Sequence, residues 1–559
     1  MMTFPLTLDR LRERAATMYA QTPVISRNPA GQRLRHTYAQ VSARSQALAR
    51  RLLADGLQRG ERVGTLMWNH HAHLEAYFGV PAAQGVLHTL NHRLGRDDLA
   101  YIINHAQDRI LLVDDVLYEV YRSIAPALST VRQVVVFRYG VDPIGGASRA
   151  GAAPAAATAD APAGVRVIDY EDWIADAPAC ALPLLDENAP ASLCYTGGST
   201  GRPKGVVYSH RALVLHAWSQ AMVDGYGVGR HDCVLGVVPM FHGNGWGLPF
   251  STALTGAKLV LPGPRLDPDS VLGLIQDEGV TFSAGVPTVW LDVARALEAT
   301  PTRWRLPANV RIVTGGAAPP EHLFTGLARH GITLYQGWGM TETASVITVS
   351  RPAPAHTPGA AGTPVSSQGQ AMPVAEVRVM AGGVAVPWDG QSVGEIETRG
   401  ACVTDAYYED ARPERWSEDG WLRTGDMGTL DANGGLRLLE RKEDLIKSGG
   451  EWIVPQALEN ALLAYPGIVE CAVIAVPHDK WGERPLALLV TSDDTTLDPS
   501  SLRGHLSERF ARWQLPEGFV QLDALPRTSV GKLARRELRL ACQQWPELDQ
   551  ALTGARVLA

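Results

Sequence analysis

Along the first hundred residues, apolar positions repeat first with a helical period and then in short buried runs. After Thr37, apolar side chains recur on one helical face as far as Leu53. Apolar runs at 62–69 and 109–115 are typical of buried strands, and residues 97–106 between them have a helical pattern. This alternation of helices and strands predicts an α/β fold with a mostly parallel sheet.

Toward the C-terminal end, a second pattern of helices and strands predicts a separate domain. Pro455 opens a helical stretch through Ala464, an apolar alternation at 469–476 is typical of a strand, and residues 501–513 again have a helical pattern. This part is long enough for a small domain of its own. The sequence therefore predicts two domains, residues 1–441 and 442–559.

The first of these domains is interrupted by a stretch of different composition. Residues 141–164 are rich in Ala, Gly and Pro, which predicts a surface loop with too little apolar bulk to pack. Strand-like runs resume at 191–195, 311–314 and 332–336, so the α/β pattern continues beyond it.

Composition narrows the class of protein. With 45% hydrophobic and 19% charged residues, the 559-residue chain is too apolar for a disordered protein and too mixed for a membrane protein. No apolar run reaches the ~18 residues of a membrane span, and we expect no signal peptide because the first residues lack an apolar region. A net charge of -7 gives no reason to expect nucleic acid as a partner. Six scattered cysteines without a CxxC pair favour reduced thiols in a cytoplasmic protein.

Lysine is rare enough to be informative. Of 51 basic residues only six are lysine, and the others are arginine. If lysine is rare only because Arg codons are preferred, the six lysines should stand at random positions. If they are kept for function, they should stand in motifs. The six are Lys204, Lys258, Lys442, Lys447, Lys480 and Lys532.

The segment from Tyr195 to His210, YTGGSTGRPKGVVYSH, has the composition of a phosphate-binding loop. Its glycines allow backbone N–H groups to approach an anion, its hydroxyls can donate to phosphate oxygens, and Lys204 can neutralise them. It is not a Walker A loop, because Pro203 separates the last glycine from the lysine. A flexible surface loop is the alternative.

The loop resembles the phosphate-loop signature of the adenylate-forming superfamily of acyl-CoA synthetases, luciferases and adenylation domains. Six further segments resemble that family in the same order along the chain. They are VPMFHGNGWGLPF (238–250), TGGAAP (314–319), YQGWGMTET (335–343), RTGD (423–426), ERKEDLIKSGGEWI (440–453) and PRTSVGKLARREL (526–538). The fold implied is a large N-terminal adenylate-forming domain of stacked sheets and helices, with ATP and acyl pockets, and a small mobile α/β C-terminal domain.

The resemblance implies roles for residues of the nucleotide motifs. Thr341 would bond the α-phosphate, and Glu342 would offer a hard oxygen to Mg²⁺. Trp338 would stack on the purine, where the family more often has tyrosine; a core aromatic is the alternative. With catalytic Lys204, the other implied ATP- or AMP-binding residues are Thr196, Gly197, Gly198, Ser199, Thr200, Gly201, Gly315, Gly316, Ala317, Ala318, Gln336, Gly337, Gly339, Met340, Asp426 and Arg441.

The resemblance also implies roles for four positions near the domain boundary and the C-terminus. Asp426 resembles the carboxylate that accepts from both ribose hydroxyls, with Arg441 as the second ribose contact. Lys532 resembles the catalytic lysine, a point charge on a flexible stem that reaches the reacting carboxylate and α-phosphate. Glu443 stands at the implied hinge, where relatives more often have Asp or Lys, and Gly197 stands where many have Ser.

The remaining implied roles concern the acid and the thiol. His242 and Trp246, together with Gly315, would line the acyl pocket, although a satisfied core histidine is the alternative for His242. Six residues of SGGEW and PHDKWGERP resemble the CoA-using branch of the family, namely Ser448, Gly449, Gly450, Glu451, Trp452 and Lys480.

The function implied is an ATP-dependent acyl-CoA ligase. A carboxylate attacks the α-phosphate of Mg·ATP to give acyl-AMP and pyrophosphate, and CoA then captures the acyl group. Medium-chain fatty acids and methylthiopropionate-like acids fit the resemblance best. The alternatives are an acyl-AMP ligase that serves a separate carrier protein and a catalytically silent nucleotide-binding relative. A homodimer stays an open alternative to a monomer.

Overall fold

The computed structural model describes most of the chain, which divides into two compact units. The described residues are 1–139, 164–196, 202–351, 367–449, 451–492, 497–527, 533–543 and 556–558. Unit 1 comprises residues 1–319, 323–376 and 399–422, and unit 2 comprises 320–322, 377–398 and 423–559. The boundary predicted at 441 lies within unit 2, and as a boundary between moving domains it stays a prediction.

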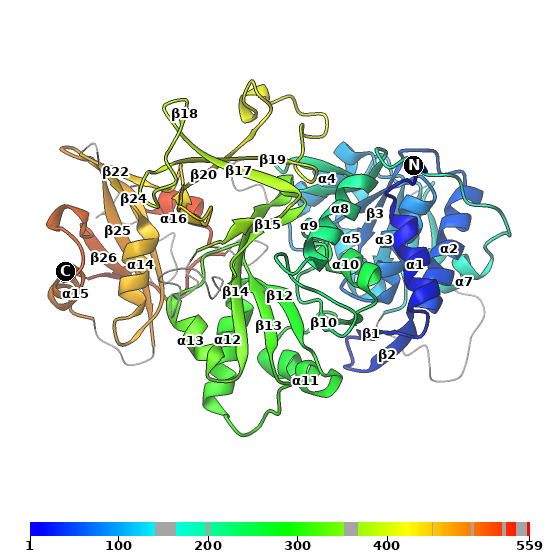
Figure 1. Cartoon of the computed structure of the whole chain (residues 1–559), viewed down its shortest axis with the longest axis horizontal. Coiled ribbons are helices and arrows are strands. Elements are labelled where there is room, and N and C mark those ends of the chain that lie inside the picture. Colours follow the sequence, from blue (N-terminus) through cyan, green and yellow to red (C-terminus); the bar gives the residue numbers. More distant parts are fainter. Residues whose placement is uncertain are drawn as a thin grey trace. The chain divides into compact units, whose positions relative to one another are not determined.

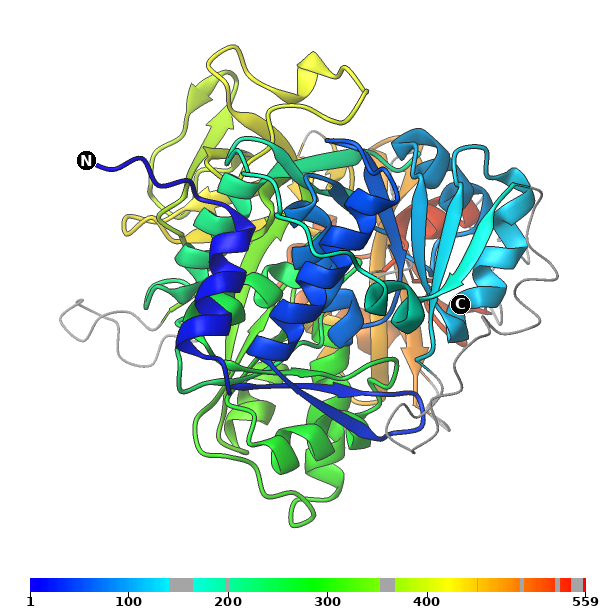
Figure 2. The same cartoon turned by 90° about the vertical axis from the view of Figure 1, so that its right-hand side faces the viewer.

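The first sheet of unit 1 has seven strands, flanked by helices (Figures 1 and 2). All neighbours are parallel except β9, which runs antiparallel to β8. In spatial order the strands are β7 (Arg166–Asp169), β6 (Gln133–Phe137), β5 (Ile110–Asp114), β3 (Arg62–Leu66), β4 (Val86–Thr89), β8 (Pro190–Tyr195) and β9 (Gly205–Ser209).

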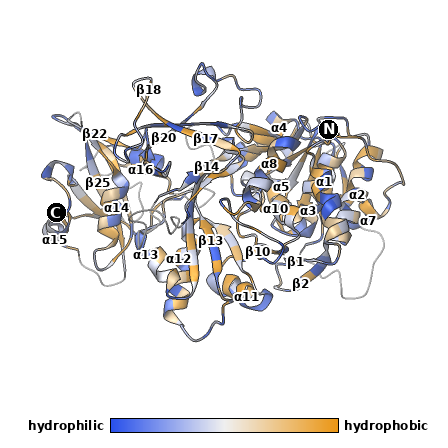
Figure 3. Ribbon diagram, in the orientation of Figure 1, coloured by the Kyte–Doolittle hydropathy of each residue, from blue (hydrophilic) through white to orange (hydrophobic). Residues whose placement is uncertain are grey.

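The second sheet of unit 1 has nine strands, of which the central six are parallel. In spatial order they are β16 (Gln370–Ala371), β15 (Ser345–Val349), β14 (Ile332–Met340), β13 (Val310–Thr314), β12 (Phe282–Gly285), β10 (Cys233–Leu235), β11 (Lys258–Leu261), β1 (Pro23–Arg27) and β2 (Arg33–Thr37). Apolar residues predominate in β13 (Figure 3), as is typical of a strand covered on both faces.

Helices cover both sheets of unit 1. Every residue of helix α3 is buried. Because the helix has no face exposed to solvent, its sequence shows no amphipathic pattern. The helices are α1 (Leu8–Met18), α2 (Tyr38–Ala54), α3 (His71–Ala82), α4 (Arg96–Ala106), α5 (Tyr118–Ile124), α7 (Tyr170–Ala175), α8 (His210–Ala221), α9 (Gly243–Trp246), α10 (Leu248–Thr255), α11 (Pro268–Glu278), α12 (Pro287–Ala299) and α13 (Glu321–Ala328).

Unit 2 is built on a five-stranded and a six-stranded sheet. The five-stranded sheet has the order β18 (Val384–Ala385), β17 (Ala375–Ala381), β19 (Gly394–Gly400), β20 (Leu422–Leu430) and β21 (Leu436–Arg441). The other contains β23 (Glu451–Ile453), β22 (Ile446–Ser448), β25 (Gly482–Thr491), β26 (Gly518–Gln521), β27 (Arg556–Leu558) and β24 (Ile468–His478), with helices α14 (Pro455–Leu463), α15 (Pro499–Ser507) and α16 (Arg535–Ala541).

Most of the elements predicted from periodicity are confirmed. The helix after Thr37 is α2, whose capping box joins Thr37 and Gln40. Two elements are shorter than predicted. The strand at 62–69 ends at Leu66, and the helix at 501–513 ends at Ser507. The loop predicted at 141–164 lies almost wholly outside the described residues.

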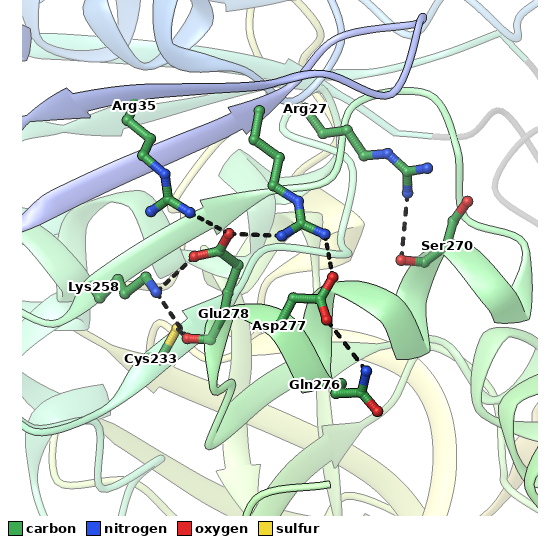
Figure 4. A network of polar contacts seen from close by, with 9 residues as sticks. Arg27, Arg35, Cys233, Lys258, Ser270, Gln276, Asp277 and Glu278 are labelled. Carbon is green, nitrogen blue, oxygen red and sulfur yellow. Dashed lines mark hydrogen bonds and ion pairs between the residues drawn. The ribbon is translucent and has the colours of Figure 1, made fainter. Parts of the chain in front are cut away.

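Lys258, the one lysine outside the segments that resemble the family, has a structural role (Figure 4). Its ammonium donates to the backbone oxygen and to Oε2 of Glu278, both at 2.8 Å. Arg33 and Arg35 donate to the other carboxylate oxygen at 3.2 and 2.8 Å. Three cations from β2 and β11 therefore converge on one buried carboxylate at the end of α11.

Two further findings concern the described residues as a whole. No helix among them is long and apolar enough to cross a membrane. All six cysteines are free thiols.

Candidate active site

The predicted phosphate loop begins where β8 ends and returns into β9. The Thr196 backbone N–H donates to the Lys204 carbonyl at 2.9 Å, and the Lys204 N–H donates to the Thr196 hydroxyl at 3.1 Å. This pair joins the two ends of the loop, where β8 (Pro190–Tyr195) ends and β9 (Gly205–Ser209) begins. Its central residues lie outside the described part, namely Gly197, Gly198, Ser199, Thr200 and Gly201.

Lys204 lies in cationic surroundings. Its Nζ is 5.3 Å from the centroid of the Tyr407 ring. Burial and then the charges of Arg412 and Arg415 lower the pKa of Lys204, and the nearby Glu342 carboxylate opposes this only in part. Such a cluster favours an anion, as expected for a phosphate site.

Thr341 and Glu342 follow directly on β14, in a single 3₁₀ turn. The Tyr208 hydroxyl donates to the Thr341 carbonyl at 2.6 Å. The Tyr407 hydroxyl donates to Oε1 of Glu342 at 2.5 Å, and the Thr404 N–H donates to its backbone oxygen at 2.8 Å. Burial and the Glu342 charge raise the pKa of Tyr407, which keeps this phenol a donor.

This arrangement fits Mg²⁺ bound through a nucleotide. No cluster of three or more His, Cys, Asp or Glu side chains suited to a metal ion exists among the described residues. Mg²⁺ commonly takes one or two carboxylates and completes its shell with phosphate oxygens and water. Tyr407 fixes the orientation of the Glu342 carboxylate, and the role of this carboxylate as a magnesium ligand stays a prediction.

Three predicted motifs meet at Gly315. A Cβ at this position would lie 2.7 Å from the Gly337 carbonyl oxygen and 3.5 Å from the ring of Trp246. The TGGAAP loop, the end of β14 and the acyl segment are therefore in contact, as the resemblance implies. Packing also explains why glycine stands at 337 and 339. A Cβ at Gly337 would lie 2.7 Å from Val346 Cγ1, and a Cβ at Gly339 would lie 1.8 Å from the Ser345 oxygen.

The other predicted nucleotide-binding residues of β14 and of the loop after β13 differ in burial. Trp338 is 4% exposed, as the core-aromatic alternative requires, and its stacking on a purine stays a prediction. Gln336 is buried and pairs with Thr314 of β13. Gly316 has a positive φ of 79°, Ala317 is exposed, and Ala318 and Met340 are half-buried.

The acyl segment has an unusual backbone. Five consecutive residues, 243–247, have positive φ, and two of them, Asn244 and Trp246, are not glycine. A left-handed tryptophan is uncommon and costs free energy, so surrounding contacts must hold it. The Gln220 amide donates to the Trp246 carbonyl at 2.6 Å, and the Ser192 hydroxyl donates to Asn244 Oδ1 at 2.8 Å. His242, half-buried, precedes this strained turn.

In unit 2 the two predicted ribose contacts lie side by side. Asp426 of β20 and Arg441 of β21 are partners in register, and Arg441 Nε lies 2.9 Å from Asp426 Oδ1. Asp426 is 5% exposed, and its N–H donates to the Thr424 hydroxyl at 3.1 Å. The guanidinium therefore holds the carboxylate in one orientation.

The segment after β21, which contains the predicted hinge, is tied to α16. The Lys442 N–H donates to the Gly425 carbonyl at 2.9 Å, and Arg539 donates to the Glu443 carbonyl at 3.3 Å. Arg539 also forms an ion pair with Asp444. Burial, with nearby Glu459 and Asp444, raises the pKa of Glu440 to about 7, although Arg535 opposes the shift.

The predicted CoA residues form a hairpin with aromatic neighbours. Ser448 of β22 pairs with Glu451 of β23, and Gly449 between them has φ 60°. A Cβ on Gly449 would meet the Trp481 ring at 2.8 Å. Lys447 and Lys480 lie over the exposed rings of Trp452 and Trp481, at 5.5 and 4.8 Å. Gly450 and Lys532 lie outside the described residues.

Several neighbours of these residues were not predicted. Tyr407, Arg412 and Arg415 carry no signature of their own, because only folding brings them to Glu342 and Lys204. Trp481 and Arg484, in contrast, belong to PHDKWGERP, so that segment already contained a signal beyond Lys480. The Arg484 guanidinium donates to the Ser448 hydroxyl at 3.2 Å.

The chain belongs to the family of AMP-binding enzymes, which confirms the resemblance and the α/β fold. Residues 12–408 match the AMP-binding enzyme domain, and residues 457–532 match the AMP-binding enzyme C-terminal domain.

Its similar proteins are aligned over nearly their whole length. A long-chain-fatty-acid–CoA ligase of Thermus thermophilus is 43% identical, and a medium-chain-fatty-acid–CoA ligase of Ectopseudomonas oleovorans is 37% identical, each over 96% of both chains. A 3-methylmercaptopropionyl-CoA ligase of Ruegeria lacuscaerulensis is 36% identical over 99% of both chains. The solved o-succinylbenzoate CoA synthetase of Bacillus subtilis with its acyl-adenylate is 26% identical, with a TM-score of 0.77 over 96% of this chain and 99% of that one.

Proposed function

We propose that the chain is an ATP-dependent, AMP-forming acid–CoA ligase. The observation that carries this proposal is the cluster in unit 1 where Lys204 lies beside Tyr407 and Tyr407 holds the Glu342 carboxylate. It combines a phosphate loop, a cation and an oriented carboxylate, which are the groups that phosphoryl-type displacement needs. The CoA ligases among the similar proteins support the same reaction.

In the first step an oxygen of the substrate carboxylate attacks the α-phosphorus of ATP. The bond to the bridging oxygen breaks, and pyrophosphate leaves with the electron pair. Lys204 balances charge on the phosphates, and Thr341 positions the α-phosphate. Mg²⁺, held through Glu342, would neutralise phosphate charge, while Asp426 and Arg441 hold the ribose. Lys532 is proposed to accompany the reacting carboxylate.

In the second step the CoA thiolate attacks the acyl carbon, and AMP leaves with the oxygen that came from the acid. The hairpin at Ser448–Gly449 and the lysine-capped rings of Trp452 and Trp481 support a CoA-binding role for this face of unit 2. Aromatic faces can stack on adenine, and lysines pair with phosphates.

The acid is proposed to be apolar. Trp246, 5% exposed and next to Gly315, contributes a large apolar ring to the acyl segment, and none of the residues from 240 to 250 is acidic. A fatty acid or a methylthio-substituted short acid fits such a wall better than an amino acid, whose ammonium needs a carboxylate. We expect the reaction in the cytoplasm, since the cysteines are free thiols. A homodimer stays an open alternative.

A panel of straight-chain, branched, methylthio and aromatic carboxylic acids, each with Mg·ATP and CoA, tests the proposal. We expect AMP, pyrophosphate and an acyl-CoA in equal amounts for the apolar acids. A carrier-protein ligase would release AMP only when a carrier protein replaces CoA. A silent relative would show no ATP–pyrophosphate exchange with any acid.

A further inference from the structure

Two arginines that no motif contains lie near Lys204 in unit 1. Arg412 directly precedes the short turn Pro413–Arg415, and Arg415 is the last residue of that turn. Lys204 Nζ lies 5.3 Å from the centroid of the Tyr407 ring, which contacts the ring of Trp416 directly after Arg415, and burial and the charges of both arginines lower the pKa of Lys204. Three cations are therefore gathered at the base of the loop.

The segment that carries these arginines is fixed to the Glu342 turn. Trp416 Nε1 donates to the Thr404 carbonyl at 3.0 Å, and its ring meets the Tyr407 ring edge-on, with 5.6 Å between centroids. Thr404 in turn donates to the Glu342 backbone, and Tyr407 to its carboxylate. The position of Arg415 is thus set by the same contacts that orient Glu342.

The two arginines differ in how their charges are compensated. Arg412 forms an ion pair with Asp410, with Nε 2.9 Å from Oδ2. The Arg415 guanidinium lies near the Tyr407 hydroxyl, and its charge and hydrogen bond oppose the rise that burial causes in the pKa of Tyr407. The Arg415 Nε, however, is buried and has no hydrogen-bond partner among the described residues. A buried, unsatisfied guanidinium nitrogen is costly, and a ligand that accepts from it would remove the cost. The planar fork of arginine matches phosphate oxygens.

We propose that Arg415, with Arg412 beside it, binds the β- and γ-phosphates of ATP and holds them as pyrophosphate leaves. The inference rests on the proposed function and adds a residue to it. As the bond from the α-phosphorus to the bridging oxygen breaks, the electron pair and the negative charge pass to the pyrophosphate. Arg415 donates hydrogen bonds to that charge, which increases in the transition state.

The diphosphate of CoA offers the same chemistry, but the position of Arg415 favours ATP. Lys204 belongs to the loop that ends β8, and Glu342 is the proposed magnesium ligand. A diphosphate that contacts Lys204 and Arg415 together would therefore lie near Glu342, the carboxylate that would hold Mg²⁺, as expected for the β- and γ-phosphates of ATP.

Binding measurements on Arg415→Ala test the proposal without knowledge of the acid. Calorimetric titrations in the presence of Mg²⁺ would compare the affinities of the protein for α,β-methylene-ATP, inorganic pyrophosphate and AMP. We expect Arg415→Ala to weaken the ATP analogue and pyrophosphate by about tenfold or more, the loss of a charge-assisted hydrogen bond. AMP, which lacks the β- and γ-phosphates, should bind within about twofold of wild type. Arg415→Lys should recover part of the affinity.

Arg303→Ala provides the matched control, because Arg303 is an exposed arginine paired with Asp269 at 2.8 Å. It should bind all three ligands as wild type does. Equal weakening of AMP and of the ATP analogue by Arg415→Ala would show a merely structural role and overturn the proposal. So would unchanged binding of the ATP analogue and pyrophosphate.

Steady-state kinetics separate the two sources of a diphosphate. We expect Arg415→Ala to raise KM for ATP and leave KM for CoA unchanged. A rise in KM for CoA alone would overturn the assignment to ATP. If wild-type protein binds the ATP analogue but releases no AMP with any acid, the proposed function fails, and the titrations still decide whether Arg415 binds the phosphates.

Discussion

At the scale of single residues, the contacts that matter most join positions far apart in the sequence. The motifs predicted Lys204 and Glu342, but Tyr407 reaches Glu342 from 65 positions away. Lys258 reaches Glu278 in the same manner, across 20 positions. Periodicity and local motifs carry no information on such pairs, so the partners of a predicted residue become visible only in the folded chain.

The Glu278 cluster yields a prediction on stability. Burial works against the charged carboxylate, but the hydrogen bond and charge of Lys258, with Arg35 and Arg33, outweigh it and lower the pKa of Glu278. Glu278→Gln should therefore lose about 2 kcal/mol of unfolding free energy near neutral pH. Because the folded pKa is depressed, this stabilisation is present above the ordinary glutamate pKa and is lost as the pH falls through the folded value.

Chemical denaturation of Glu278→Gln and Asp277→Asn over a pH series checks this. Asp277 pairs with the same Arg33 but is 41% exposed, so its variant should lose less than about 1 kcal/mol. The gap between wild type and Glu278→Gln should close as the pH falls from the ordinary glutamate pKa through the lowered pKa of Glu278. Equal losses for the two variants, or a gap independent of pH, would contradict the account.

At the scale of elements, patterns predicted the type of an element better than its end. The helix expected at 501–513 ends at Ser507, and Arg512–Gln514 form a separate 3₁₀ turn, after which Arg484 donates to the Leu515 carbonyl, as it does to that of Trp513. The strand expected at 62–69 ends at Leu66, because the Trp68 N–H donates to Asp114. No local pattern contains these tertiary hydrogen bonds.

The proposed ribose-binding role of Asp426, on the paired strands β20 and β21, can be tested by substitution. Asp426→Ala should raise KM for ATP far more than KM for the acid, because two hydrogen bonds to the ribose, on the order of 3 kcal/mol together, are lost. Glu395→Gln is the control, since Glu395 is a carboxylate paired with Lys442 at 3.3 Å and has no assigned role. A rise confined to KM for the acid would mean that Asp426 does not bind the ribose.

The end of β21 should respond to pH. The raised pKa of Glu440, about 7, means that the folded chain holds its proton more tightly than the unfolded chain. Its contribution to stability is therefore present below the ordinary glutamate pKa and is lost as the pH rises through about 7. Glu440→Gln mimics the protonated form and should be more stable than wild type at high pH. Calorimetric Tm values that fall equally with pH in both proteins would disprove this.

At the scale of the whole molecule, the family resemblance predicts that the C-terminal domain turns about Glu443 between the two half-reactions. Lys532→Ala should then lose acyl-AMP formation by about 10²-fold but still convert supplied acyl-AMP to acyl-CoA. Gly450→Leu should do the reverse, because a side chain there would obstruct the thiol. Both half-reactions are measured for both variants, with Tm as the folding control. Parallel losses in the two steps would remove the rotation from the mechanism.

The central claim, that a carboxylate attacks the α-phosphate before CoA captures the acyl group, is tested most directly by isotope transfer. An acid from the active panel is labelled with ¹⁸O in its carboxylate and incubated with Mg·ATP, CoA and the protein, and the products are analysed by mass spectrometry. One labelled oxygen should appear in the phosphate of AMP and none in pyrophosphate, because AMP leaves with the oxygen that formed the acyl-adenylate bond. Label in inorganic phosphate, with ADP as the nucleotide product, would contradict the account.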